Sequence, residues 1–241
     1  MTVNHTFQTQ FAVPLSCEGC VKSVSDALHK LGGITRVEGN VQEQLVTIEG
    51  SAAPSAIVEA IQETGRDAIL RGTGASNTVS ILETFVDKRQ TQHEGTDREV
   101  RGLARMVEVG SGRTLVDLTV RGVSPGTYRA TIREYGSLAE GAASTGPVWK
   151  DKGELGAVEV DKSGRGSAFV DHGFQIWEAI GHAMVLTRQE ESDGGLQNDE
   201  DTVVGVIARS AGVWDNDKTV CSCTGKTLWD ERKEEVAKGM L

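Results

Sequence analysis

Alternation of hydrophobic and polar positions over the first 71 residues predicts a small α+β domain. The segment Phe7–Val13 alternates with the period of two that is typical of a strand. Residues 21–31 repeat their apolar positions at helical spacing, and Gly32–Gly33 ends that helix. The pattern then predicts strands at Ile34–Glu38 and Gln44–Glu49, a helix beginning at Pro54 and a strand at Ala68–Leu70. The resulting order βαββαβ over residues 1–71 is typical of a ferredoxin-like domain.

Beyond a short Gly-containing linker at residues 72–76, the pattern changes to short alternating segments separated by turns. Helical periodicity is not found over residues 77–215, so an all-β Greek-key barrel or sandwich is expected there. Residues 216–241 have little periodicity and are expected to form an extended tail, with a short charged helix near 229–237. The expected strands cover residues 79–85, 100–109, 115–120, 127–135, 157–160, 167–170, 183–186 and 203–208.

Length, charge and hydropathy narrow the possible partners and compartment. The 241 residues suffice for two domains. The net charge is -10, and the sequence contains no block of basic residues. Both features argue against nucleic acid and anionic membranes as partners. The chain lacks the ~20-residue apolar run that spans a bilayer. Its N-terminus lacks the features of a signal peptide, so a cytosolic protein with reduced thiols is expected.

The four cysteines form two pairs, and the first pair is the CxxC motif of Cys17 and Cys20. This motif lies between a strand and a helix, which places Cys20 in the first helical turn, where unpaired N–H groups favour a thiolate. Two thiolates at this spacing bind Cu(I) in a nearly linear arrangement, whereas zinc usually takes four ligands. The alternative is a thioredoxin-like redox motif, although such motifs usually carry a Pro between or just after the cysteines.

The second pair, Cys221 and Cys223, forms a CxC motif in the expected tail. In an extended segment residues i and i+2 point to the same side, so both sulfurs are placed to share one Cu(I). The same pair would also close into a small strained disulfide, which is a ready exchange partner. The tail is therefore interpreted as a site for metal transfer and thiol exchange.

The N-terminal segment resembles the heavy-metal-associated domain of copper chaperones, whose loop reads Met-x-Cys-x-x-Cys. In this chain Leu15 replaces the Met, which in that family packs beneath the loop and binds no metal. The resemblance implies Cu(I) binding by Cys17 and Cys20. Arg66 falls where family members often carry a cation that offsets the charge of the Cu(I)–dithiolate, and a solvated surface charge is an equal alternative.

Residues 77–215 resemble copper/zinc superoxide dismutase in the segments Gly126–Gly136, Ala143–Pro147, Gly153–Gly156 and Gly205–Ile207. The resemblance implies a Greek-key barrel, but it also implies that the metal ligands have been replaced. A copper site of that kind needs several converging imidazoles, so we expect no dismutase activity. The positions of histidine ligands hold Thr131, Arg133, Val148 and Thr187.

Other features of that family are replaced as well. Glu154 stands in place of the zinc aspartate, and Asp201 in place of the catalytic arginine. The two cysteines of the family's internal disulfide align with Ala142 and Val204. We interpret the histidines that remain as ordinary surface or rim residues, namely His29, His93, His172 and His182.

Together with the segments Gly205–Trp214 and Cys221–Arg232, these features resemble the fungal form of the copper chaperone for superoxide dismutase over nearly the whole chain. The resemblance implies a metallochaperone and not an enzyme, acting in the cytosol and also in the mitochondrial intermembrane space. Its barrel would dock on immature Cu/Zn superoxide dismutase as a heterodimer, or pair with itself as a homodimer. Cu(I) would be transferred by thiolate exchange, and the target's disulfide would form through Cys221 and Cys223. The alternatives are a copper-independent thiol–disulfide oxidoreductase and a copper store or sensor.

Overall fold

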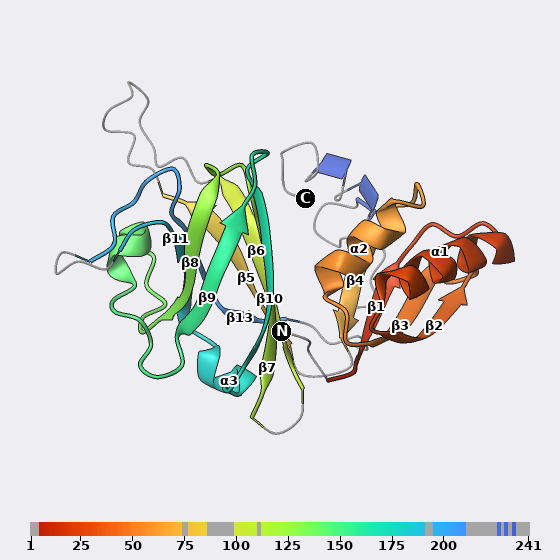
Figure 1. Ribbon diagram of the computed structural model, residues 1–241, viewed down its shortest axis with the longest axis horizontal. Coiled ribbons are helices and arrows are strands. Elements are labelled where there is room, and N and C mark those ends of the chain that lie inside the picture. The colour runs from red at the N-terminus through yellow and green to blue at the C-terminus, as the bar shows by residue number, and fades with distance from the viewer. Residues whose placement is uncertain are drawn as a thin grey trace.

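The computed structural model describes residues 5–73, 77–85, 99–109, 112–190 and 195–210, together with residues 226–227, 229–230 and 233–234. These residues form two domains that lie next to each other (Figure 1). A four-stranded sheet with two helices precedes an antiparallel barrel, so the predicted α+β fold class is confirmed. No helix within the described segments is long and apolar enough to cross a membrane.

The first domain, residues 5–73, is called the head domain. Its sheet has the order β2-β3-β1-β4, and neighbouring strands are antiparallel. Gly72 and Thr73, which were expected in the linker, belong to the last strand. The elements are β1 (Phe7–Ala12), α1 (Glu18–Leu31), β2 (Ile34–Asn40), β3 (Leu45–Gly50), α2 (Pro54–Gln62) and β4 (Ile69–Thr73).

Local sequence explains where the first helix lies. Cys17 is its N-cap and has an extended backbone, with φ -163° and ψ 171°. Val24 and Leu28, four residues apart, are the buried residues of this helix and pack into the head-domain core. Gly32 and Gly33 have φ values of 81° and 69°, in the left-handed region that favours glycine, and they end the helix.

The second domain, among the described residues, is a barrel of eight strands, with a ninth strand of two residues paired to its edge at β5. Pairing of β12 with β5 closes it, and β7 lies beside β10 while β8 lies beside β11, as in a Greek key. The one-turn helix α3 (Ile176–Ala179) was not predicted, because four residues are too few to show a helical period. The strands are β5 (Asn77–Thr84), β6 (Val100–Glu108), β7 (Thr114–Arg121), β8 (Gly126–Arg133), β9 (Glu154–Val160), β10 (Arg165–His172), β11 (Ala183–Thr187), β12 (Val203–Val206) and the short β13 (Ala208–Arg209).

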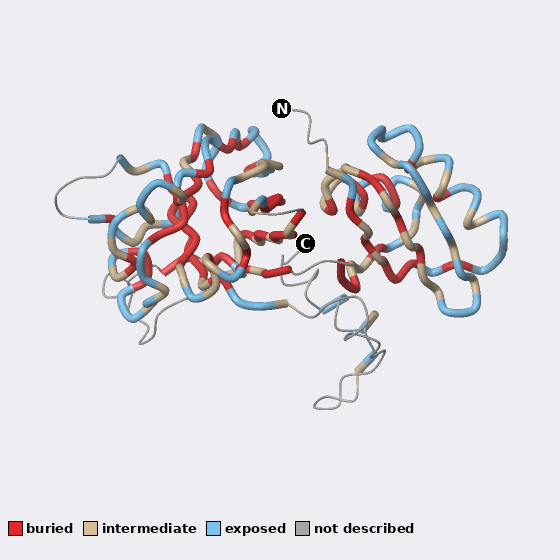
Figure 2. Tube along the Cα trace, turned by 90° about the horizontal axis from the view of Figure 1, so that it is seen from below, coloured by how far each residue is buried: buried red, intermediate tan, exposed pale blue. Residues whose placement is uncertain are grey.

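Each domain has its own hydrophobic core (Figure 2). Alternation along β7 shows how the barrel is filled, because Val116 and Leu118 belong to the barrel core. Leu115 and Asp117 alternate with them and point to the outside of the barrel, yet they are only 1% and 2% exposed. The outer face of the barrel is therefore covered at this place.

Candidate metal centre

The CxxC motif brings two sulfur atoms together at the start of α1. The distance between Cys17 Sγ and Cys20 Sγ is 3.8 Å. The first helical turn sets this distance, because the Cys20 backbone N–H donates to the Cys17 carbonyl at 2.9 Å. Cys17 is exposed and Cys20 is half-buried, and both thiols are free. The pair is accessible to a metal donor and to a competing thiolate.

The surroundings of Cys20 favour its thiolate. Its Sγ lies 3.1 Å from the hydroxyl of Ser16. Hydrogen bonds from the Ser16 side chain, the Ser16 backbone and the Arg66 side chain, in this order, lower the pKa of Cys20 to about 6. A thiolate is the form that binds a soft metal ion, so the low pKa of Cys20 favours the metal-binding form at neutral pH. Sequence reasoning missed Ser16, although its i, i+4 spacing to Cys20 is a signal that could have identified it.

A second residue that sequence reasoning missed, Gln44, holds the loop from below. Its side-chain oxygen accepts the backbone N–H of Leu15 at 2.8 Å, and its side-chain nitrogen donates to the carbonyl of Leu15. Gln44 has φ 58°, so it occupies the left-handed region in the turn between β2 and β3. Leu15 itself is 2% exposed and lies in the head-domain core. Nothing in a single sequence links position 44 to this loop.

Arg66 follows α2 and lies beside the motif. Its guanidinium also donates to the carbonyl of Thr64 at 3.0 Å, which orients the side chain. A cation next to Cys20 favours the negative charge of a dithiolate. Of the two alternatives for Arg66, the geometry favours the neighbouring cation over a purely solvated charge.

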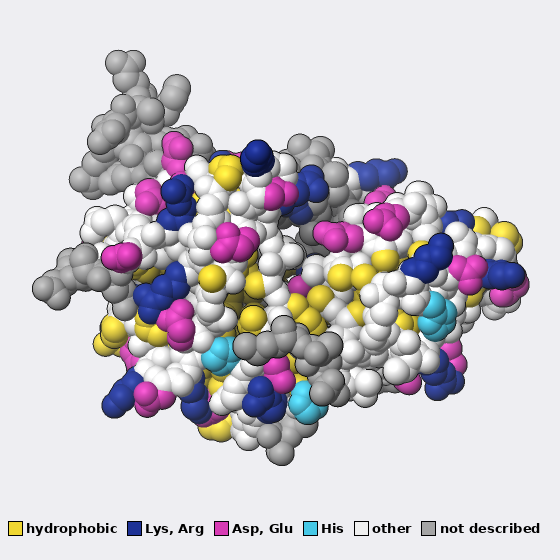
Figure 3. Space-filling view, viewed as in Figure 1, with side chains coloured by type: hydrophobic (Ala, Val, Ile, Leu, Met, Phe, Trp, Pro, Cys, Tyr) yellow, Lys and Arg dark blue, Asp and Glu magenta, His cyan; other side chains and the backbone are white. Residues whose placement is uncertain are grey.

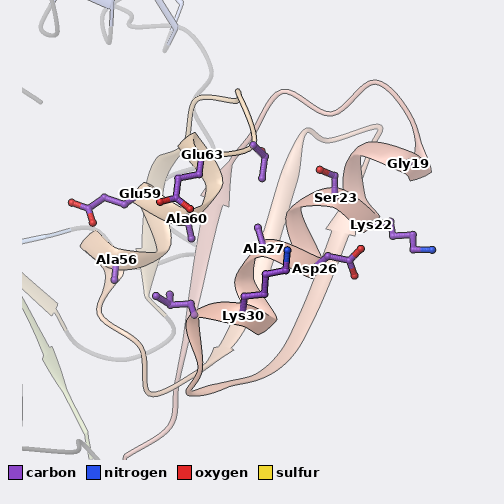
Figure 4. A pocket seen from close by; sticks show the side chains of 12 residues that line it. Gly19, Lys22, Ser23, Asp26, Ala27, Lys30, Ala56, Glu59, Ala60 and Glu63 are labelled. Atoms are coloured by element: carbon purple, nitrogen blue, oxygen red, sulfur yellow. The ribbon is translucent and has the colours of Figure 1, made fainter.

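The motif lies at the end of the head domain that is turned away from the barrel. Figure 4 shows Gly19, which is located between the two cysteines, at the far end of α1, whereas Lys30 lies at the end nearer the barrel. Cys221 and Cys223, the second predicted pair, lie outside the described residues. Among the residues that the structure describes, no group of three or more His, Cys, Asp or Glu side chains converges on one point.

In the barrel, the positions that align with the histidine ligands of dismutases hold side chains that do not converge on one point. Arg133 is 2% exposed, and its Nε donates to the carbonyl of Gly146 at 2.9 Å. The hydroxyls of Thr187 and Thr202 lie 2.8 Å apart. The buried hydroxyl of Thr131 has no hydrogen-bond partner within the described segments, and Val148 forms an isolated bridge with Arg133. Thr131, Arg133 and Thr187 alternate with core residues along β8 and β11, so they lie on the outer face of the barrel, where they are buried. Among the described residues, these positions offer no set of metal donors.

The positions of the missing crosslink and of other dismutase features are also accounted for. Ala142 and Val204 are each 1% exposed and belong to one apolar cluster, so hydrophobic contact occupies the place of a disulfide. Glu154 accepts a hydrogen bond from Arg129 at 2.9 Å. Asp201 accepts the backbone N–H of Ser124 at 2.8 Å. These contacts are apolar packing and hydrogen bonds within the barrel.

Of His29, His93, His172 and His182, three are described, and none of these three joins Cys17 and Cys20 in a group that could hold a metal ion. His29 is exposed on α1, and His172 is half-buried next to the ring of Phe174. His182 stacks on Trp149 with ring centroids 4.6 Å apart, and its Nδ1 lies 2.7 Å from the carbonyl of Arg133. His93 lies outside the described residues.

Comparison with known proteins agrees with this division of the chain. Residues 10–67 match the family model of the heavy-metal-associated domain. The superoxide dismutase 1 copper chaperone of Debaryomyces hansenii is 43% identical, and the alignment covers 98% of this chain and 98% of that protein. The protein of the same name from Saccharomyces cerevisiae is 39% identical over the full length of both chains.

A human relative extends the comparison beyond the fungi. The copper chaperone for superoxide dismutase of Homo sapiens is 30% identical over 95% of this chain and 90% of its own length. All three relatives are named as copper chaperones and not as enzymes. The identities are highest for the fungal proteins, as the fungal resemblance of the sequence predicts. The chain therefore belongs to the family of copper chaperones for superoxide dismutase.

Proposed function

We propose that this chain binds Cu(I) at Cys17 and Cys20 and delivers it to immature Cu/Zn superoxide dismutase. The observation that carries the proposal is an accessible dithiol, with sulfurs 3.8 Å apart, in a chain whose barrel offers no converging ligands among its described residues. A two-sulfur site leaves Cu(I) open to attack by a third thiolate. Copper then passes from sulfur to sulfur, and no free ion is released.

Docking is assigned to a barrel face around the segment Gly205–Ile207. The N–H of Gly181 donates to the carbonyl of Ile207 at 2.9 Å, which joins this segment to the end of α3. Two large side chains of this region are exposed to solvent. Trp177 is 64% exposed and Tyr135 is 57% exposed. Exposed aromatic residues of this kind commonly anchor protein interfaces. The occupant is a dismutase subunit in a heterodimer, or a second copy of this chain in a homodimer.

The tail cysteines are assigned the step on the partner. Cys221 and Cys223 would receive Cu(I) and present it to the partner's copper site. If they enter as a disulfide, a partner thiolate attacks one tail sulfur and forms a mixed disulfide, and the partner's second thiolate then releases the tail. The tail gains two electrons as a dithiol and the partner's cysteine pair loses them. Cu(I) capture by the cysteine pairs requires reduced thiols, whereas the disulfide exchange requires a tail pair already oxidised by a two-electron oxidant such as dioxygen. We place this chemistry in the cytosol and the mitochondrial intermembrane space.

The assignment of the tail is tested with the double variant C221S/C223S at low copper. Activation of copper-free, disulfide-reduced dismutase should be lost, while Cu(I) binding by the head domain is unchanged. The matched variant C17S/C20S should lose activation mainly when copper is scarce. Full activation by C221S/C223S would contradict the assignment.

The interface is tested separately with Trp177→Glu. A charge on the docking face should abolish the heterodimer in size-exclusion chromatography and leave Cu(I) binding intact.

The alternative function is tested by strict copper chelation. If the partner's disulfide still forms under that condition, the chain acts as a thiol–disulfide oxidoreductase that does not depend on copper.

A further inference from the structure

The head domain covers the outer face of barrel strands β6 and β7. Leu115 and Asp117 on β7 point outward and would be exposed on an isolated barrel, but both are buried in the whole chain. The covering elements are the beginning of β1 and the N-terminus of α2. Figure 3 shows hydrophobic side chains along the line where the two domains meet.

The polar part of this contact is formed by Asp117 and Ser55. The Asp117 carboxylate accepts the Ser55 backbone N–H at 2.9 Å and the Ser55 hydroxyl at 2.6 Å. Ser55 is the second residue of α2, so its N–H has no acceptor within the helix. A carboxylate from the barrel thus satisfies a helix end of the head domain. Arg105 on β6 lies 3.9 Å from the same carboxylate.

The apolar part surrounds Phe7, the first residue of β1. Phe7 is 9% exposed and clusters with Val107, Val109 and Leu115 of the barrel, with Phe169 packed against them. Burial of a side chain of this size removes a large apolar area from water and stabilises the contact between the two domains. The two domains are therefore joined by a hydrophobic contact and by a directional one.

We propose that the head domain is docked on the barrel as one rigid unit and that the Asp117 carboxylate is the anchor that fixes its orientation. The anchor holds α2 by two donors of one residue, which sets both position and direction, whereas the contact of Phe7 alone would allow sliding. The segment between β4 and β5 then connects two domains that are already fixed.

Electrostatics explains why this contact is specific. Burial raises the pKa of Asp117 above its ordinary value, and the hydrogen bonds of Ser55 and the charge of Arg105 oppose that rise. A buried carboxylate that loses its donors bears the full cost of desolvation. Orientations of the head domain that keep Asp117 covered but take Ser55 away from it are disfavoured for this reason.

The anchor determines where the CxxC motif is presented. β1 begins at Phe7 in the contact and ends at Ala12, shortly before the motif. Six residues of strand span on the order of 20 Å, at about 3.3 Å per residue. The motif is thus held at a distance from the barrel, on the side that faces away from it (Figure 4). This inference does not depend on which protein receives the copper.

The test uses the full-length, reduced, metal-free chain and measures ¹⁵N relaxation and amide exchange. In the unaltered chain the head domain and the barrel should share one rotational correlation time. In Asp117→Ala the head domain should have a shorter correlation time than the barrel. Exchange of the Ser55 amide should accelerate by roughly ten- to a hundred-fold, the range for loss of a hydrogen bond to a charged group.

Two further variants keep the test decisive. Ser55→Ala removes only the hydroxyl and should produce a smaller change in the same direction, even if Asp117→Ala folds poorly. Glu154→Gln removes a carboxylate that pairs with Arg129 within the barrel and should change neither readout. Separate correlation times in the unaltered chain would overturn the rigid unit. Unchanged tumbling and exchange in both Asp117→Ala and Ser55→Ala would overturn the anchor.

The result is independent of the proposed function. Cu(I) binding by Cys17 and Cys20 should be the same in all of these variants, because the motif lies far from the contact. A chain with a fixed head domain that fails to activate dismutase would refute the copper delivery and leave the anchor standing.

Discussion

The CxxC loop of the head domain and the former ligand positions of the barrel differ in what their polar atoms face. In the loop, two sulfurs lie 3.8 Å apart at the surface, with hydrogen-bond donors that favour a thiolate. In the barrel, Arg133 and Thr187 are buried and bind a carbonyl and a neighbouring hydroxyl. Among the described residues, these barrel positions thus offer no donors that converge on one point. What makes a metal site is the convergence of free donor atoms, and the fold alone does not supply it.

The largest expected effect is the loss of the loop's donors. In C17S/C20S the head domain should lose its Cu(I) site, because hydroxyls are poor ligands for this soft ion. Competition with a chromophoric Cu(I) chelator measures the loss, in a background of C221S/C223S so that the tail does not contribute. Tight Cu(I) binding that persists in this quadruple variant would place a metal site elsewhere, and the contrast with the barrel would fail.

In the barrel, the same comparison predicts an effect on stability and none on copper. Arg133→Ala leaves the carbonyl of Gly146 without its donor and creates a cavity, which should lower the free energy of unfolding by about 2–4 kcal/mol. Denaturant titration measures this value. The control is Arg129→Ala, since Arg129 forms a partly exposed ion pair with Glu154, worth at most about 1 kcal/mol. If both substitutions lowered the free energy of unfolding equally, Arg133 would have no special structural role.

Protonation of Cys20 offers a finer measure of the loop. With a pKa of about 6, its alkylation rate in the metal-free chain should be half-maximal near pH 6. Since the folded pKa is depressed, the thiolate's contribution to stability is present above the ordinary thiol pKa and is lost as the pH falls through about 6. Ser16→Ala should move the midpoint upward. Peptide mass spectrometry measures the alkylation of Cys20 separately from that of Cys17. A midpoint near pH 9 in the unaltered chain would contradict the lowered pKa of Cys20.

The smallest effect is expected at Leu15, beneath the loop. Leu15→Met conserves volume and should change stability by less than about 1.5 kcal/mol, with no change in Cu(I) affinity. Leu15→Ala, by contrast, should cost about 2–5 kcal/mol, because this side chain is fully buried. Thermal unfolding and chelator competition on the two variants separate packing from ligation. Tighter Cu(I) binding by Leu15→Met would show that this position reaches the metal.

Much of this contrast was predictable from the sequence, for physical reasons. Alternation along β1 and β7 and helical spacing in α1 report which side chains face a core, so the fold class followed from pattern. The CxxC spacing at a strand–helix junction indicated the thiolate site. Ser16 was within reach of the same reasoning. Gln44 and Asp117 were not, because their partners, Leu15 and Ser55, lie 29 and 62 residues away. Contacts between distant segments leave no periodic signal.

The central claim is that copper bound by this chain passes to another protein. The direct measurement mixes the reduced, Cu(I)-loaded chain with copper-free, disulfide-reduced Cu/Zn superoxide dismutase in the presence of a chelator that captures free Cu(I). Size-exclusion chromatography with metal analysis then follows the copper, and dismutase activity and the partner's disulfide are assayed. The account predicts that copper moves to the partner, and that the disulfide forms and activity appears once dioxygen is admitted as the two-electron oxidant. Copper that stays on the chain or passes to the chelator, with an inactive partner, would contradict it.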